Sequence, residues 1–507
     1  MDVSVAILCY AAGSSMPPLT CLTDDDSAVA GAPSPLPKFL LPLAGRTPLA
    51  LLLEATAKAG IPRSRVHLLC SPDTRQEVES AVESMARNPN STPPPAAASS
   101  ETAAASSPSS SPLHLHTLSS ACSGTASAVR HLSSLPSPES PSSPLVPPSH
   151  HLLVLPADVL LEDPATLPRL CNDHLSADPR AAATVLLRDV GAEDEEGRPI
   201  KESKKGKLGL LQREADKIDV VGLVKPAKGV PRLVLKRSRV EIDEGEENVG
   251  ETPKLEVPKS MLRAALAGPS PGALSVRTDL LDLHCFVLSP WAWRSLLASK
   301  ACKPMDSVQS EFLPHLIAAQ QAPAAEAYGD AEGDGGAGAI PPSSVEGLAL
   351  PAPADSFCVA ASVLARPEKG KSAALHVRVN SVANYAYACR EAVANAIRKV
   401  VPGSVIGNLP GTVNARDNTI LGSESKKGTG GSIKNSTIGA SVSIGAKCKI
   451  LNCILMDGVK VGNGCILQNS ILCKGAVLGD SVNLSDVHVP YGIEVAGGTK
   501  AKGELDL

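Results

Sequence analysis

The first 190 residues alternate between short apolar runs and longer segments whose apolar residues recur every three or four positions. The short runs have the length of buried strands and cover residues 3–9, 65–70, 113–118, 151–155 and 181–188. The longer segments predict helices at residues 47–60, 75–87, 125–134 and 164–176. Thr47 before Pro48 is typical of a helix start, and Gly60 of a helix end. Because strands that alternate with helices pair in parallel through crossovers, we expect a doubly wound α/β sheet.

The end of the chain follows a different period. Four aligned copies of a 17-residue repeat cover residues 435–451, 452–468, 469–485 and 486–502. A degraded copy begins at Asn418. Within a copy the apolar positions are six, six and five residues apart, as at Ile438, Ile444 and Ile450. One short strand and one tight turn per step makes three sides, so each copy predicts one coil of a triangular parallel β-helix.

Three low-complexity segments interrupt these patterns. Residues 89–112 and 136–149 are rich in Ser and Pro, and residues 321–355 are rich in Ala, Gly and Pro. Such compositions bury too little apolar surface to offset chain entropy, so we predict disordered insertions there. The resulting domain prediction is an α/β domain at 1–320 with two insertions, a linker at 321–356, a connecting strand and helix at 357–400, and a β-helix at 401–507.

Composition narrows the classes of function. Hydrophobic residues make up 43% of the 507 residues but aromatic residues only 2%, so Leu, Val, Ile and Ala must fill the cores. The net charge of −4 argues against binding DNA through whole-surface attraction. No apolar stretch approaches the roughly 18 residues of a membrane span, so no membrane segment is expected. The 13 cysteines form no Cys-x-x-Cys pair, which favours buried thiols over a zinc site.

Two segments near the N-terminus resemble the signature of the sugar nucleotidyltransferases. Residues 11–20 read Ala-Ala-Gly-Ser-Ser-Met-Pro-Pro-Leu-Thr, and residues 37–43 read Pro-Lys-Phe-Leu-Leu-Pro-Leu. The family has an arginine where this chain has Ser15, and glycines where it has two alanines. Because a triphosphate needs positive charge and close backbone approach, catalysis would suffer from this change. The resemblance therefore implies a vestigial nucleotide pocket at Gly13, Ser14 and Ser15.

Lys38 and a Gly-Thr-Ala run also resemble ligand contacts of that family. Lys38 matches the lysine of a Lys-Pro motif, although Phe39 replaces the proline. It is either a phosphate contact or a structural remnant at a loop edge. Gly124, Thr125 and Ala126 resemble the run on which the nucleotide base lies, and they also fit a plain helix start.

Two aspartates and one histidine are the remaining candidates for chemistry. Asp158, in Leu-Pro-Ala-Asp after the fourth predicted strand, resembles the family's Mg²⁺-binding aspartate, although a turn or cap role is also common there. Asp282, before an apolar strand at residues 284–288, is a candidate second metal contact. His488 is the only histidine within the repeats, and it lies in a regular coil with no inserted loop. This argues against the acyltransferase activity of many hexapeptide-repeat proteins.

The whole arrangement resembles two groups of proteins, the sugar-nucleotide pyrophosphorylases and the gamma and epsilon subunits of translation initiation factor 2B. Residues 282–289, 310–314, 379–385 and 454–461 are similar to segments of the gamma subunits. The epsilon subunits continue into a helical exchange domain after the repeats, which favours the gamma family. This resemblance implies a doubly wound nucleotidyltransferase-like domain followed by a left-handed parallel β-helix.

The resemblance also implies a function. It implies a non-catalytic cytosolic subunit that requires no cofactor and assembles with the epsilon, alpha, beta and delta subunits. Their complex releases GDP from initiation factor 2 by binding its nucleotide-free form more tightly. Neither DNA nor a membrane is an expected partner. A regulatory or weakly active subunit of a sugar-nucleotide pyrophosphorylase is the alternative, because it would share the decayed loop and the β-helix.

Overall fold

The computed structural model describes most of the chain outside its low-complexity segments. The described residues are 2–9, 36–87, 113–119, 122, 124–137, 140–177, 181–190, 219–226, 229–238, 273–320, 344–345, 348–349, 357–366, 374–398, 404–406, 409 and 411–503. Gly13, Ser14, Ser15 and the predicted insertion at 89–112 lie outside them. So does the predicted linker at 321–356, apart from the short strands β11 (Ser344–Val345) and β12 (Leu348–Ala349).

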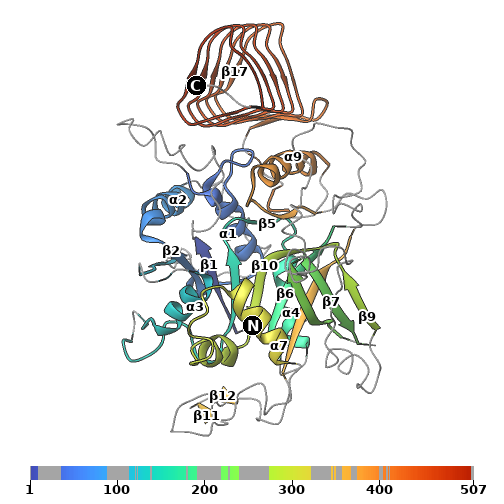
Figure 1. The fold of residues 1–507 in the computed structure, drawn as a ribbon. Helices are drawn as coiled ribbons and strands as arrows, with labels where there is room; N and C mark the ends of the chain where they lie inside the picture. Colours follow the sequence, from blue (N-terminus) through green and yellow to red (C-terminus); the bar gives the residue numbers. More distant parts are fainter. Residues whose placement is uncertain are drawn as a thin grey trace, which may run out of the picture.

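Within the described residues, a ten-stranded mixed sheet forms the body of the N-terminal α/β unit (Figure 1). In spatial order its strands are β3 (His114–Thr117), β2 (Val66–Cys70), β1 (Val3–Cys9), β4 (His151–Pro156), β10 (Leu280–Leu288), β6 (Ala181–Asp189), β13 (Cys358–Leu364), β8 (Arg232–Ser238), β7 (Asp219–Lys225) and β9 (Ala273–Arg277). All five strands predicted in the first 190 residues are therefore confirmed. The neighbours β3, β2, β1 and β4 pair in parallel, as predicted.

The expectation of parallel pairing throughout was wrong. Strand β10 lies between β4 and β6 and is antiparallel to both. Strands β7, β8 and β9 form a further antiparallel region, and β13 pairs in parallel with β6. The segment predicted to be a connecting strand is thus an inner strand of the sheet. Alternation along the sequence reports only neighbours in the chain, so it could not reveal strands that return from far away.

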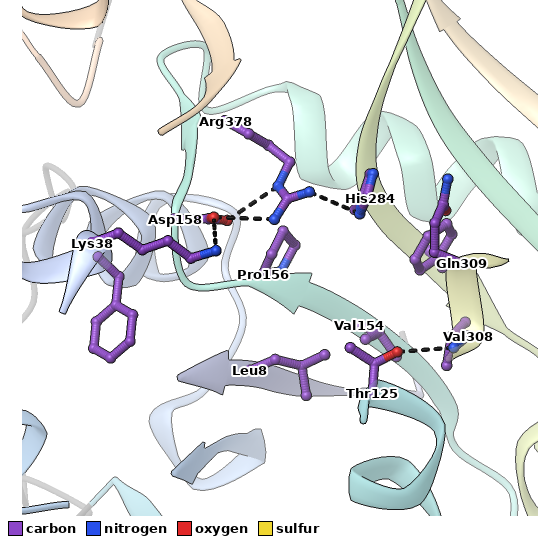
Figure 2. A pocket seen from close by; sticks show the side chains of 12 residues that line it. Leu8, Lys38, Thr125, Val154, Pro156, Asp158, His284, Val308, Gln309 and Arg378 are labelled. Atoms are coloured by element: carbon purple, nitrogen blue, oxygen red, sulfur yellow. Dashed lines mark hydrogen bonds and ion pairs between the residues drawn. The ribbon is translucent and has the colours of Figure 1, made fainter. Parts of the chain in front are cut away.

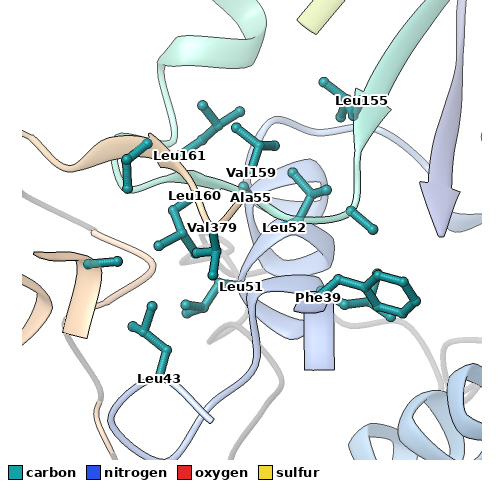
Figure 3. Close-up of a cluster of buried hydrophobic side chains, with 14 of the residues drawn as sticks. Phe39, Leu43, Leu51, Leu52, Ala55, Leu155, Val159, Leu160, Leu161 and Val379 are labelled. Atoms are coloured by element: carbon teal, nitrogen blue, oxygen red, sulfur yellow. The ribbon is translucent and has the colours of Figure 1, made fainter. Parts of the chain in front are cut away.

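Helices cover both faces of the sheet, because alternate strand residues point to opposite sides. In β1, Val5 and Ile7 enter one hydrophobic core and Ala6 and Leu8 enter another. The first core is completed by α1 (Pro48–Lys58), α2 (Arg75–Arg87), α4 (Thr166–Ser176) and α9 (Val382–Arg398), and Figure 3 shows its part around α1. The second is completed by α3 (Thr125–Ser134), η7 (Ala292–Leu296), η8 (Val308–Phe312) and α7 (Leu313–Ala319).

Short elements link these layers. They are η2 (Lys38–Leu40), η3 (Arg63–Arg65), η4 (Pro72–Thr74), β5 (Val159–Leu161) and β14 (His376–Arg378). The predicted ends of α1 are confirmed, because the Thr47 side chain accepts a hydrogen bond from the Ala50 amide at 3.2 Å and Gly60 has a φ of +76°. Both features are usual helix-end devices. Local sequence therefore determines where this helix begins and ends.

The predicted disordered insertion at 136–149 is instead an ordered turn over its described residues. Pro136 and Pro144 form an isolated β-bridge, and Val146 is buried in the second core. The Arg294 guanidinium donates a hydrogen bond to the Val146 carbonyl. A composition rich in Ser and Pro missed this anchor, since a single buried apolar side chain with a backbone contact fixes the segment.

The repeats form three sheets that wind around one apolar interior. The first face contains β15 (Thr412–Asn414), β16 (Thr419–Leu421), β19 (Thr437–Ile438), β22 (Ile454–Leu455), β25 (Ile471–Leu472) and β28 (His488–Val489). The second contains β17 (Lys426–Lys427), β20 (Ser443–Ile444), β23 (Lys460–Val461), β26 (Val477–Leu478) and β29 (Glu494–Val495). The third contains β18 (Ser432–Lys434), β21 (Lys449–Leu451), β24 (Ile466–Gln468), β27 (Asn483–Ser485) and β30 (Lys500–Lys502). Apart from antiparallel β15, pairing is parallel.

The 17-residue period is confirmed by the register of these sheets. Ile450 pairs with Leu467 and Leu467 with Leu484, and all three are buried. The apolar positions predicted from the repeat therefore stack as the interior of one coil on the next. Hexapeptide repeats with parallel strands on three faces fit a left-handed β-helix.

We predict that Gly462→Ala destabilises the β-helix more than Gly458→Ala does. A Cβ at Gly462 would lie 2.5 Å from the Gly479 carbonyl oxygen of the next coil, so the two coils would have to separate. A Cβ at Gly458 would meet no atom within 4 Å, and only its φ of +71° is unfavourable. We expect losses of about 3 kcal/mol for overpacking and about 1 kcal/mol for the strained φ, measured by urea unfolding. Equal losses would contradict the stacking argument.

The first face of the β-helix is the one that docks onto the α/β unit. Its outward residues Ile454 and Ile471 are buried in the first core together with Tyr491 and with Tyr385 of α9. The Tyr385 hydroxyl donates a hydrogen bond to the Pro42 carbonyl at 2.6 Å, which holds the helix against the α/β unit. Figure 1 shows α9 between the sheet and the β-helix. A continuous apolar core therefore joins the two parts.

Candidate functional site

A small pocket lies where β1 and β4 end, at the edge where ligands bind in sheets of this kind. The Ala157 amide donates a hydrogen bond to the Leu8 carbonyl at 3.1 Å, which keeps the two strand ends side by side. The cavity has a volume of about 100 Å³ (Figure 2). It is lined by Leu8, Lys38, Phe39, Thr125, Val154, Pro156, Asp158, His284, Phe286, Val308, Gln309 and Arg378.

Asp158 is at the centre of the polar side of this pocket. Its carboxylate accepts hydrogen bonds from Arg378 Nε at 3.1 Å and Arg378 Nη2 at 3.0 Å, one on each oxygen. Lys38 Nζ lies 3.1 Å from Oδ2 of the same carboxylate. Strand register explains the approach of Arg378, because it pairs with Val159 across β14 and β5. Figure 2 shows the two cations converging on Asp158 from different elements.

The charge state of Asp158 follows from this pairing. Burial would raise the pKa of its carboxyl, but the charges of Arg378 and Lys38 outweigh burial and lower that pKa to about 2. Asp158 is therefore ionised at neutral pH, and its negative charge is already compensated by two protein cations. A buried carboxylate held in this way acts as a structural ion-pair partner.

His284 enters the pocket because β10 is irregular at that point. The pairing register of β10 shifts between Asp282 and Phe286, and His284 has a φ of +55°. Such a bulge re-aims a side chain. Arg378 Nη1 donates to His284 Nδ1 at 2.8 Å, and burial together with the Arg378 charge lowers the pKa of His284 to about 3. His284 is thus a neutral acceptor that helps to orient Arg378.

Asp282, the candidate second metal contact, belongs to another ion pair. Its carboxylate lies 3.3 Å from Lys236 Nζ and accepts hydrogen bonds from Gln309 Nε2 at 2.8 Å and the His284 amide at 2.6 Å. Burial raises the pKa of Asp282, but Lys236 outweighs that effect, so the pKa is lowered. This carboxylate stabilises the bulge in β10.

The Gly124-Thr125-Ala126 run is engaged by another part of the chain. The Ala126 amide donates to the Asp306 carbonyl at 2.7 Å, and the Val308 amide donates to Thr125 Oγ1 at 2.8 Å. A Cβ at Gly124 would lie 2.3 Å from the Asp306 carbonyl oxygen, so glycine permits this close approach. The three small residues therefore form a docking point for the segment that leads into η8.

We predict that Thr125→Val loosens the start of η8 while Thr125→Ser does not. Valine leaves the buried Val308 amide without its acceptor, which costs about 1–3 kcal/mol. Serine keeps the hydroxyl. Hydrogen exchange measured by mass spectrometry should be faster around Val308 in the valine variant only. Similar exchange in both variants would mean that this hydrogen bond does not hold the segment.

The residues described around Asp158 do not suit a magnesium ion. Mg²⁺ prefers carboxylate and water oxygens in octahedral geometry, whereas both oxygens of Asp158 are bound by cations. Across the described residues there is no group of three or more His, Cys, Asp and Glu that could hold a metal ion. The metal role of Asp158 stays a prediction from sequence, and this arrangement disfavours it.

The structure brings some predicted residues together and separates others. Lys38, Thr125 and Asp158 line one pocket, whereas Gly124 and Ala126 contact Asp306 beside it. Sequence reasoning missed Arg378, His284 and Gln309. Only Arg378 had a usable signal, since a charged residue in an apolar strand ahead of α9 needs a buried partner.

Comparison with known proteins bears on the repeats. A protein family described as "GlmU-like, C-terminal hexapeptide" matches residues 412–486. A search of the curated proteins found no match to the chain. The family match supports the hexapeptide character of the β-helix and is in keeping with a nucleotidyltransferase-like architecture. It covers the repeats and does not reach the α/β unit.

The helices were also compared with what a membrane span requires. Among the residues that the structure describes, no helix combines the length and apolarity needed to cross a bilayer.

Proposed function

We propose that this chain is a non-catalytic cytosolic subunit of the translation initiation factor 2B complex. It pairs with the epsilon subunit, assembles with the alpha, beta and delta subunits, and helps to bind initiation factor 2. In this proposal the α/β unit is a nucleotidyltransferase-like domain that has become a scaffold.

The observation that carries the non-catalytic part is the double ion pair of Asp158. Nucleotidyl transfer would need this carboxylate to hold a metal ion next to a triphosphate. Here Arg378 and Lys38 occupy both of its oxygens. The sequence also has Ser15 where the resembled family has an arginine. A metal contact and a phosphate contact are therefore both compromised.

The choice of complex rests on sequence segments. Residues 310–314 and 454–461 are similar to the gamma subunits, and the structure describes both segments. The first segment runs from η8 into α7, and the second from β22 into β23. Nucleotide exchange needs no covalent chemistry, because an exchange factor only has to bind the nucleotide-free state more tightly than the GDP state. A rigid scaffold that presents partner surfaces is sufficient for this role.

Affinity purification of the tagged chain from its own cells, followed by mass spectrometry, tests the proposal. We expect the epsilon, alpha, beta and delta subunits and initiation factor 2 among the co-purified proteins. Recovery of a sugar-nucleotide pyrophosphorylase without these subunits would overturn the proposal and support the regulatory-subunit alternative.

A direct assay separates a scaffold from a weakly active enzyme. The purified chain should release no pyrophosphate from nucleoside triphosphates and a sugar 1-phosphate in the presence of Mg²⁺. Release that depends on Lys38, abolished by Lys38→Met, would instead identify an active nucleotidyltransferase.

A further inference from the structure

The third face of the β-helix differs in character from the other two. Its outward strand positions carry four exposed lysines, which are Lys434, Lys449, Lys500 and Lys502. They also carry Leu451 and Ile466, which are 41% and 43% exposed. None of the outward positions on β18, β21, β24, β27 and β30, all of them described, is acidic. The first face is covered by the α/β unit, and the second mixes Lys460 with Glu494.

The strand register places the apolar side chains between the lysines. Leu451 pairs with Lys434 on one side, and Ile466 pairs with Lys449. Beyond them the uncharged positions of β27 separate the apolar pair from Lys500 and Lys502 of β30. The face therefore has an apolar centre with positive charge toward both ends.

Hydrogen bonds between coils make this face rigid. The Lys449 amide donates to the Cys465 carbonyl at 2.8 Å, and the Ile466 amide donates to the Val482 carbonyl at 2.9 Å. The inward residues Ile450 and Leu467 are buried beneath the face. A partner would not have to order these backbone segments on binding, which lowers the entropy cost of association.

The composition of the face favours a protein over a nucleic acid. A protein interface typically has an apolar centre and a polar rim. Binding to single-stranded nucleic acid usually uses aromatic side chains on which bases stack, and the outward positions of the third face carry no aromatic residue. Complementary charge would steer an acidic partner onto the lysines and speed its association.

We propose that the third face docks a protein partner whose contacting surface is acidic around an apolar centre. The proposal rests on the proposed function in one respect, namely that this partner is another subunit of the complex or its substrate factor. The two exposed aliphatic side chains supply the central contact, and the lysines select for negative charge.

Site-specific photo-crosslinking in the native assembly tests this proposal. Benzoylphenylalanine replaces Gln468, which pairs with Leu451 at the centre of the face, and in a control chain it replaces Ser443 on the second face. We expect the probe at position 468 to crosslink an acidic protein segment that mass spectrometry identifies. The probe at position 443 should not crosslink that segment. Adding Lys449→Glu and Lys500→Glu should reduce the crosslink at least tenfold, with the fold checked by circular dichroism.

The outcomes separate this proposal from the proposed function. An acidic segment of a protein outside the exchange complex would support the docking face and overturn the proposed function. An assembly that retains the exchange-factor subunits but gives no protein crosslink at position 468 would overturn the docking face and leave the proposed function standing. A crosslink to RNA, or one unaffected by charge reversal, would also overturn the docking face.

Discussion

Asp158→Asn is expected to lower the free energy of unfolding by about 3–5 kcal/mol, because it leaves Arg378 and Lys38 as buried cations without their anion. Asp158 is 1% exposed, so water cannot replace the lost carboxylate charge. Urea unfolding followed by circular dichroism measures the change. The structure of the pocket should loosen with it, because Arg378 also holds His284 through the 2.8 Å contact.

A matched control separates burial from charge. Glu79→Gln makes the same carboxylate-to-amide change in the exposed pair with Arg75, whose closest atoms are 4.0 Å apart. Exposed ion pairs of this kind contribute about 0–1 kcal/mol. If Asp158→Asn costs no more than Glu79→Gln, the ion-pair interpretation of the pocket is wrong.

An apolar replacement provides a second control. The triple variant Lys38→Met, Asp158→Leu and Arg378→Met removes all three charges together. Replacing a buried ion cluster by apolar residues of similar size is often close to neutral, whereas removing one member is costly. We therefore expect the triple variant to unfold at a higher urea concentration than Asp158→Asn.

Acid should destabilise the protein well above the pH range in which its carboxylates become protonated. His67, His174 and His376 are buried, and burial, together with neighbouring positive groups, lowers the pKa of each to about 3. In the unfolded chain a histidine has a pKa of about 6.5. The unfolded state therefore binds more protons between these values, and stability falls as the pH decreases through this window.

The expected size follows from the same linkage. Each of these histidines should cost about 2 kcal/mol between pH 8 and pH 5, so together they should cost about 6 kcal/mol. Urea unfolding at the two pH values measures the difference. His174→Gln should reduce that difference by about 2 kcal/mol, and His67→Gln with His174→Gln by about 4 kcal/mol. A pH dependence that these variants leave unchanged would assign the acid sensitivity to other groups.

Part of this protein is determined by sequence alone, because its contacts are local. Helices α2 and α3 begin and end at the predicted residues, since apolar spacing and helix-end residues act within a few positions. The β-helix was equally accessible. Each of its inner residues stacks on a residue 17 positions away, so a tertiary contact is written into the sequence as a period.

The sequence also identified part of the candidate site. Lys38, Thr125 and Asp158 were selected from short motifs, and they line the same pocket. The partner that determines the chemistry of Asp158 was not identified, because Arg378 lies 220 residues further along the chain. No periodic pattern connects two residues so far apart.

Tertiary structure alone decided the features that combine distant segments. Strand β10 entered the sheet between β4 and β6, and its bulge turned His284 toward Arg378. The packing of the α/β unit decided which face of the β-helix became buried. Periodicity places a residue on the outside of a coil, but only the arrangement of the whole chain determines whether that outside meets protein or solvent.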